Sequence, residues 1–164
     1  MIRNWVKTDE GRYELLIDGS KAGTLAKLPN TSDSRAMIKL AEREYMIRRT
    51  GFWKNNIEVI DQNRTLVARV FYEKWYANTW IIEYNTHVYK LVVRNNPMAE
   101  WAVLEGDTVL LSYGLTHQDG KTGTKITASP ALTNFLFDAL LWYLFAPIAA
   151  ENTADNEVFL TLLA

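Results

Sequence analysis

Apolar and polar side chains alternate with a period of two through most of the first 127 residues. Turn residues separate the alternating runs, among them Asp18-Gly19, the triplet 61–63 and Asp119-Gly120. Such alternation is typical of strands that bury one face, and many short strands at even spacing are typical of a sandwich or barrel. The pattern therefore predicts about a dozen antiparallel strands.

The predicted strands cover residues 13–17, 21–28, 51–60, 65–72, 75–84, 89–93, 98–104, 108–113 and 121–127. Residues 35–50 are ambiguous, because their Ala, Glu, Lys and Met content favours a helix. Tyr45 and Ile47, however, are flanked by charged residues, as in a strand with one buried face. We interpret most of this segment as strand.

Residues 129–152 break the pattern, because they are apolar on nearly every side. Ser129 followed by Pro130 resembles a helix N-cap with proline at the first helical position. Residues 132–144 are good helix formers and aromatics without a glycine. Pro147 cannot donate a hydrogen bond to the carbonyl of Tyr143, so we expect a helix near 130–146 that ends or kinks near Ala146.

This helix could in principle be a membrane span, which needs about 20 apolar residues. Asp138 argues against a span, because an acidic side chain at the centre costs roughly 2.5–3.5 kcal/mol on insertion scales. No Lys or Arg follows Lys125 to anchor the far end. We therefore favour a helix enclosed by the sheet, in which Asp138 lies at a surface-facing end or is hydrogen-bonded to a partner.

Strands with one apolar face need a cover, and the late helix is the one apolar segment large enough to provide it. We expect a mainly β fold, in which an antiparallel barrel of about twelve strands surrounds a hydrophobic C-terminal helix. Residues 1–164 should form a single domain. The tail after Pro147 is apolar at 158–163 and could dock again as a short helix or strand.

The order of about twelve short strands followed by an apolar helix resembles the tubby-like C-terminal domain superfamily, of the phospholipid scramblase and LURP-one-related type. The most similar local stretch is 51–70, GFWKNNIEVIDQNRTLVARV. The chain differs after Pro147, where the family's helix usually ends the domain. The resemblance implies a closed barrel threaded by its own helix, and attachment to membrane phosphoinositides or other phospholipids.

Composition removes several function classes. The chain has no Cys, so disulfides, Cys-based metal sites and a thiol nucleophile are excluded. Its N-terminus has no apolar core typical of a signal peptide, so a cytoplasmic protein is the default expectation, with peripheral membrane attachment if it binds lipid. A pI near 6.1 disfavours nucleic-acid binding.

Charge is unevenly spread along the chain. Residues 1–94 carry 16 Lys and Arg against 11 Asp and Glu, whereas residues 95–164 carry 2 against 8. Such asymmetry can indicate an anionic partner for the basic half. In a single barrel the two halves can also interleave in space, and we favour this second explanation.

Candidate catalytic and metal-binding residues are sparse. The chain lacks a glycine-rich phosphate loop, a GxSxG elbow, an HExxH helix and an EF-hand loop. His117 and Asp119 could act as a general base and its orienting group, but two residues apart at a hairpin they are more often turn residues. Asp61, Asn63 and Glu58 could ligate a cation, yet a turn explains the first two. We predict a non-enzymatic protein with no cofactor and no metal.

The densest basic group consists of Arg43, Arg48, Arg49 and Lys54. Guanidinium groups suit bidentate phosphate binding, and the adjacent Phe52-Trp53 suits a membrane interface. On a strand Arg48 and Arg49 point to opposite faces, so only one can join a given patch. The alternative is a solvated edge with Glu42 and Glu44 as partners.

Our leading functional hypothesis is a module that binds phospholipid or phosphoinositide headgroups at the group just named. The runner-up is a barrel that binds a small ligand or a protein and has no membrane role. A hydrolase is a third class, which depends on His117 and Asp119.

Overall fold

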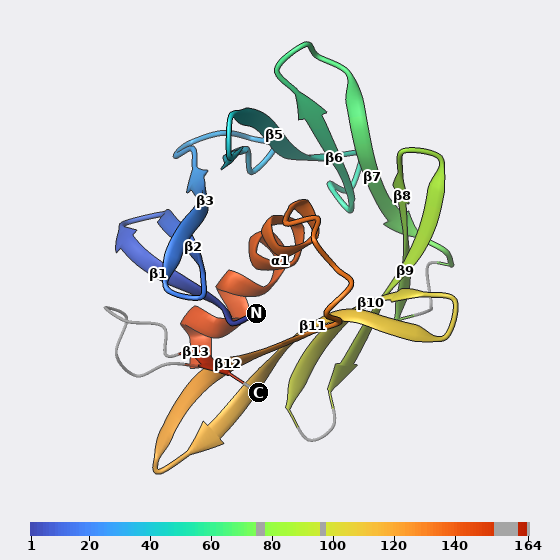
Figure 1. Ribbon diagram of the computed structural model, residues 1–164. Coiled ribbons are helices and arrows are strands. Elements are labelled where there is room, and N and C mark those ends of the chain that lie inside the picture. Colours follow the sequence, from blue (N-terminus) through green and yellow to red (C-terminus); the bar gives the residue numbers. More distant parts are fainter. Residues whose placement is uncertain (75–77, 96–97, 153–160, 164) are drawn as a thin grey trace.

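The computed structural model describes residues 1–74, 78–95, 98–152 and 161–163. Twelve antiparallel strands form a nearly closed barrel, and the helix α1 lies inside it (Figure 1). The strands are β1 (Arg3–Asp9), β2 (Arg12–Ile17), β3 (Ser20–Lys27), β4 (Ala36–Leu40), β5 (Arg43–Thr50), β6 (Asn56–Asp61), β7 (Leu66–Tyr72), β8 (Thr79–Tyr84), β9 (His87–Asn95), β10 (Ala99–Glu105), β11 (Thr108–Gln118) and β12 (Lys121–Ala128). The predicted mainly β barrel around a C-terminal helix is confirmed.

Each strand pairs with the next one along the chain, so the barrel is a continuous meander. The ambiguous segment 35–50 is a hairpin of β4 and β5 that turns at Ala41, which has a φ of 55°. Its interpretation as strand is therefore confirmed. The part of the predicted strand 75–84 at residues 75–77 lies outside the described residues.

The chain returns to the sheet after the helix. A short strand, β13 (Thr161–Leu163), pairs in parallel with β12, with Thr161 opposite Thr124. It lies on the side of β12 that faces β1, where the two ends of the meander approach each other (Figure 1). Residues 161–163 of the apolar tail thus dock as a strand.

The helix α1 spans Leu136–Asn152, so its predicted start near 130 is wrong. Ser129 and Pro130 belong to a turn, in which the Leu132 N–H donates to the Ser129 carbonyl at 3.0 Å. The carbonyl of Leu132 accepts a hydrogen bond from Arg3 at 2.7 Å and is therefore used outside the helix. Asn134 provides the cap, because its Oδ1 accepts from the Leu136 N–H at 3.1 Å.

Of the two alternatives expected near Ala146, an end or a kink, the end is wrong, because α1 continues through Pro147 to Asn152. Proline removes one backbone hydrogen bond, but Pro147 itself is exposed, and Ala146 and Ala149 on either side of it are buried in the barrel. Burial of the flanking residues keeps the chain helical past the proline. In the described part of the chain, no helix is both long and apolar enough to cross a bilayer.

Side chains of the helix fill the barrel lumen. The indole of Trp142 stacks on that of Trp5 from β1, with ring centroids 5.7 Å apart and planes 6° from parallel. Tyr13 meets the same indole edge-on at 5.5 Å, and Tyr113 lies 6.3 Å from it. The core therefore joins β1, β2 and β11 to the centre of α1.

Asp138 is fully buried in the first turn of α1 and has two partners. Its Oδ2 accepts from Arg3 Nε at 3.1 Å, and its Oδ1 accepts from the Tyr113 hydroxyl at 2.8 Å. Trp5 Nε1 in turn donates to the Tyr113 hydroxyl at 2.8 Å. The prediction that Asp138 is hydrogen-bonded is confirmed.

Burial raises the pKa of the Asp138 carboxyl, and the Arg3 charge and the Tyr113 hydrogen bond oppose this rise. Burial, reinforced by the nearby charge of Asp138, also raises the pKa of the Tyr113 hydroxyl well above 10.0.

Candidate functional site

One end of the barrel contains a cavity of about 370 Å³, where the loop between β3 and β4, the end of β5 and the helix meet. Three of its lining residues are basic, and we call it the basic pocket. It is lined by Lys27, Leu28, Thr31, Ser34, Arg35, Arg49, Tyr143 and Pro147.

Strand alternation explains why two cations reach this pocket. Lys27 follows the buried Leu25 by two residues on β3, and Arg49 follows the buried Ile47 by two residues on β5. Residues two apart on a strand share a face. The inward face is therefore apolar at mid-barrel and becomes cationic at its mouth.

Among the described residues, no carboxylate compensates the charges of Lys27 and Arg49. Within the described residues neither side chain takes part in an ion pair. Burial lowers the pKa of Lys27, and the positive charge of Arg49 lowers it further. Arg35 differs, because its guanidinium is paired with Asp33 at 2.9 Å. The pocket is therefore electropositive, and a bound anion would reduce the repulsion between Lys27 and Arg49.

Tyr143 forms the wall that the helix contributes. Its hydroxyl donates to the Ser34 carbonyl at 2.7 Å, and the guanidinium carbon of Arg49 lies 5.8 Å from its ring centroid. Burial raises the pKa of the Tyr143 hydroxyl, and Arg49 opposes the rise through its charge and a hydrogen bond. The neutral phenol thus orients the Arg49 side chain and ties the helix to the β3–β4 loop.

Internal hydrogen bonds fix the β3–β4 loop, residues 28–35. The Leu28 N–H donates to the Arg35 carbonyl at 2.9 Å, and the Arg35 N–H donates to Thr31 Oγ1 at 2.9 Å. The Arg49 N–H donates to the Asp33 carbonyl at 2.8 Å. The pocket is therefore formed before any ligand arrives, which lowers the entropy cost of binding.

Of the four basic residues predicted as one group, Arg49 and Lys54 stay adjacent, whereas Arg43 and Arg48 lie apart from them. Arg49 enters the basic pocket, and its Nη1 donates to the backbone carbonyl of Lys54 at 3.4 Å. Arg48 faces outward, where its Nη2 lies 3.8 Å from Glu58 Oε1. Arg43 is exposed at the opposite end of β5, beside Asp61. The prediction that Arg48 and Arg49 point to opposite faces agrees with these positions.

Sequence reasoning did not associate Lys27 and Tyr143 with the site. Lys27 lies on β3 and Tyr143 on α1, and both are far from Arg49 along the chain. A basic residue two positions after a buried apolar residue at a strand end is the local signal for Lys27. No comparable local signal marks Tyr143.

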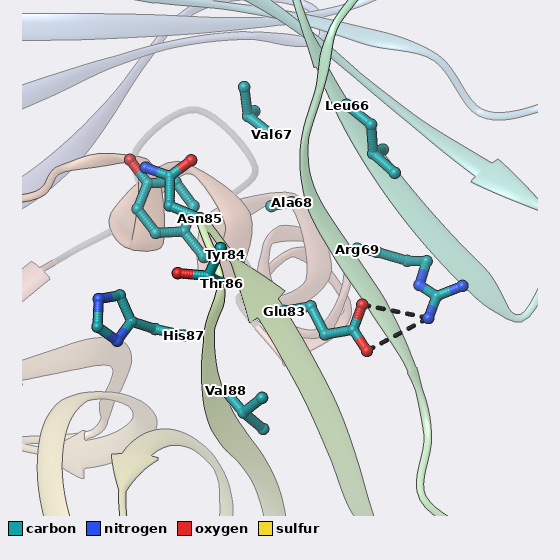
Figure 2. A pocket seen from close by; sticks show the side chains of 10 residues that line it. All are labelled: Leu66, Val67, Ala68, Arg69, Glu83, Tyr84, Asn85, Thr86, His87 and Val88. Carbon is teal, nitrogen blue, oxygen red and sulfur yellow. Dashed lines mark hydrogen bonds and ion pairs between the residues drawn. The ribbon is translucent and has the colours of Figure 1, made fainter.

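A second cavity, of about 480 Å³, lies elsewhere, against β7, β8 and the turn before β9 (Figure 2). Its two formally charged residues neutralise each other, because Arg69 Nη2 lies 3.1 and 3.3 Å from the two carboxylate oxygens of Glu83. His87 at its edge is exposed. This cavity therefore presents no uncompensated charge for an ionic ligand.

Of the residues considered for catalysis and for metal binding, Asp119 and Asn63 lie in turns, His117 lies near the end of β11, and Glu58 and Asp61 lie on β6. His117 Nδ1 lies 3.1 Å from Thr122 Oγ1, while Asp119 occupies the hairpin turn with a φ of 54°. Asp61 Oδ1 accepts from the backbone N–H groups of Asn63 and Thr65, both at 2.9 Å. In the part of the chain that the structure describes, no three His, Asp or Glu side chains are grouped as metal ligands.

Comparisons of the chain with protein-family models, with curated proteins and with solved structures find no match.

Proposed function

We propose that this protein binds the phosphate-bearing headgroups of anionic membrane lipids in the basic pocket and catalyses no reaction there. The observation that carries this proposal is the pair Lys27 and Arg49, two partly buried cations at the barrel mouth that have no carboxylate partner among the described residues. A phosphate between them could accept two hydrogen bonds from the guanidinium and one from the ammonium group. Binding would also relieve the repulsion between the two cations.

Both the volume of the pocket and its electrostatic potential suit a phosphate-bearing headgroup. Its volume of about 370 Å³ is within the usual range for small-molecule sites. The negative end of the helix dipole would disfavour an anion, but its effect is confined to the last turn. Of the helix residues that line the pocket, Tyr143 lies nine and Pro147 five residues before Asn152, the last residue of α1. Both precede the last turn, so the two cations determine the local potential.

Two further considerations support a headgroup over the runner-up. The resemblance of the element order to tubby-like domains implies the same ligand class. A barrel that takes a small ligand into its lumen would need space there, and Trp5 and Trp142 occupy that space.

Sedimentation with vesicles tests the proposal. Phosphatidylcholine vesicles with and without phosphatidylinositol bisphosphate would be incubated with wild type, Lys27→Met and Arg49→Gln. Each variant loses charge-assisted hydrogen bonds, so we expect binding to the phosphoinositide vesicles to weaken about tenfold or more. Wild-type affinity should fall as salt rises.

Arg43→Gln is the matched control, because it removes the same charge at the opposite end of β5. It should bind like wild type. Equal losses for Arg43→Gln and Arg49→Gln would show that net charge, not the pocket, drives binding. Absence of binding by wild type would reject the proposed function.

A further inference from the structure

The turn between β5 and β6 presents two aromatic side chains to solvent. Phe52 is 88% exposed and Trp53 is 78% exposed, the highest values for large apolar side chains in the described residues. Their rings meet edge to face, with centroids 4.7 Å apart and planes at 89°. We call this pair the aromatic tip.

The backbone holds the tip in position. The Lys54 N–H donates to the Gly51 carbonyl at 3.2 Å, which closes a turn whose two central residues are Phe52 and Trp53. Gly51 and Lys54 have φ values of 88° and 56°, a conformation that is easy for glycine and uncommon for lysine. The chain thus adopts a tight turn that directs both rings away from the barrel.

Folding does not explain this exposure. The barrel buries Trp5, Trp142, Tyr113 and Phe145 almost completely, so its core has the capacity for large rings. Adjacent exposed aromatics form a contiguous apolar patch, which usually marks a contact with another phase or molecule.

The tip adjoins the basic pocket through Arg49, whose guanidinium lines the pocket and donates to the Lys54 carbonyl at 3.4 Å. Lys54 itself is exposed on the same turn. Aromatic rings beside lysine and arginine match the region of an anionic bilayer where acyl chains meet phosphates. Phe52 and Trp53 would add no affinity for a headgroup free in solution. When the headgroup belongs to a membrane lipid, the two rings can insert into the bilayer interface beside it.

We propose that Phe52 and Trp53 insert into the interface of an anionic bilayer while the basic pocket holds a headgroup of the same membrane. This inference depends on the proposed function and names the membrane, not a soluble phosphate, as the source of the ligand. The occupant of the tip is thus lipid, and the membrane faces the end of the barrel that carries the β3–β4 and β5–β6 loops.

The double variant Phe52→Ser, Trp53→Ser tests the tip with the full chain. Two probes are compared: phosphatidylcholine vesicles containing phosphatidylinositol bisphosphate, and soluble inositol trisphosphate. Loss of the partial burial of two rings should weaken vesicle binding about tenfold or more. Affinity for inositol trisphosphate should be unchanged. Because apolar insertion is not screened by salt, the difference from wild type should persist at high salt.

The matched control is Leu66→Ser, Val88→Ser, which removes two exposed apolar side chains from the outer wall at the second cavity. It should bind vesicles like wild type. If the tip variant also binds vesicles like wild type, the insertion is rejected and the proposed function stands. A tip variant that loses inositol trisphosphate as well would also reject insertion, since the turn would then only shape the pocket.

The same two probes also distinguish a failure of the basic pocket from a failure of the aromatic tip. A wild type that does not bind inositol trisphosphate, yet binds vesicles through the tip, would reject the pocket as the headgroup site and with it the joint proposal, and only membrane contact by the two rings would remain. A wild type that binds neither probe would reject both proposals.

Fluorescence gives a second readout. Trp53→Phe keeps an aromatic ring at the tip and removes its indole emission, so it should bind vesicles nearly as well as wild type. Lipids brominated near the headgroup end of the acyl chains should quench wild-type emission more than Trp53→Phe emission. Equal quenching of both would place Trp53 outside the membrane and overturn the insertion.

Discussion

Removal of the Asp138 carboxylate should destabilise the barrel more than removal of a carboxylate from its surface. Arg3 and Asp138 are 3% and 0% exposed, and Asp138→Ala would leave the Arg3 guanidinium buried with the Leu132 carbonyl as its remaining polar partner among the contacts described above. The Tyr113 hydroxyl would lose its acceptor in the same step. Both groups remain out of water because Trp5 and the helix cover them.

The magnitude follows from the burial. Loss of one partner of a buried ion pair costs about 3–5 kcal/mol, and an unsatisfied buried hydroxyl costs about 1–3 kcal/mol. The two costs overlap because the groups share one network, so we expect about 4 kcal/mol in total. In a protein of this size that corresponds to a fall in Tm of about 8–16 °C.

Urea unfolding, followed by tryptophan fluorescence and far-UV circular dichroism, measures the change. The midpoint should fall with an unchanged m value, because the extent of the surface exposed is the same. The double variant Arg3→Met, Asp138→Leu should recover part of the loss, since an apolar pair of similar volume leaves no buried charge. Only the orphaned Tyr113 hydroxyl and Leu132 carbonyl would remain.

Glu83→Ala provides the surface comparison, because the Arg69–Glu83 pair is about half exposed at 3.1 Å. Its loss should cost at most about 1 kcal/mol. An Asp138→Ala variant that loses no more stability than Glu83→Ala would refute the reasoning, since it would mean that water or a rearranged side chain reaches Arg3.

Three further outcomes are expected. Lys27→Met should be at least as stable as wild type in urea at neutral pH. Burial and the charge of Arg49 lower the pKa of Lys27 in the folded state. Protonation of Lys27 therefore opposes folding, and this effect disappears only when the pH rises above the unfolded pKa of 10.5. Wild-type stability should fall in thermal melts as pH rises above 10.0, because the pKa of Tyr113 is raised in the folded state. Tyr113→Phe should reduce the slope of the unfolding free energy against pH by about 1.4 kcal/mol per pH unit. Gly23→Ala should cost about 1–3 kcal/mol in urea, since its Cβ would meet the Lys39 carbonyl at 2.6 Å, whereas Gly114→Ala meets only ordinary contacts.

Local patterns predict much of the barrel, because a half-buried strand has a period of two and its turns have recognisable residues. The hairpin at Asp18-Gly19 shows this, with both residues at positive φ. The strand β1 was missed, because its first inward residue is Arg3, which looks like a solvent-facing charge. The distant Asp138 and the Leu132 carbonyl make that position favourable for arginine.

The helix start was misplaced for a similar reason. Ser129-Pro130 has the local chemistry of a helix start, but a contact across the barrel decides the outcome. Arg3 binds the Leu132 carbonyl, and the chain then begins its helix after Asn134. Residues more than a hundred positions apart set this boundary, so a local pattern cannot contain it.

The candidate site shows the same limit. Arg43 and Arg49 are close in sequence, but a strand rises about 3.3 Å per residue, so they lie at opposite ends of β5. Lys27 and Tyr143 join Arg49 only because the sheet curves around the helix. A grouping by sequence proximity therefore joined Arg43 to Arg49, which the strand keeps apart, and omitted Lys27 and Tyr143, which the barrel brings next to Arg49.

The apolar core and the cationic mouth of the barrel are both formed by the inward-facing positions of the same strands. Different residues therefore determine stability and ligand binding. On β3 and β5 the inward positions are apolar up to Leu25 and Ile47 and then cationic at Lys27 and Arg49. A change at Arg49 alters the field of the pocket but leaves the packing around Trp142 intact. Changes at Asp138 act in the opposite way, because they weaken the core network at the other end of the helix axis. Variants at Arg49 should therefore lose ligand and keep their unfolding midpoint, whereas Asp138→Ala, at temperatures where it is still folded, should keep its affinity for the headgroup.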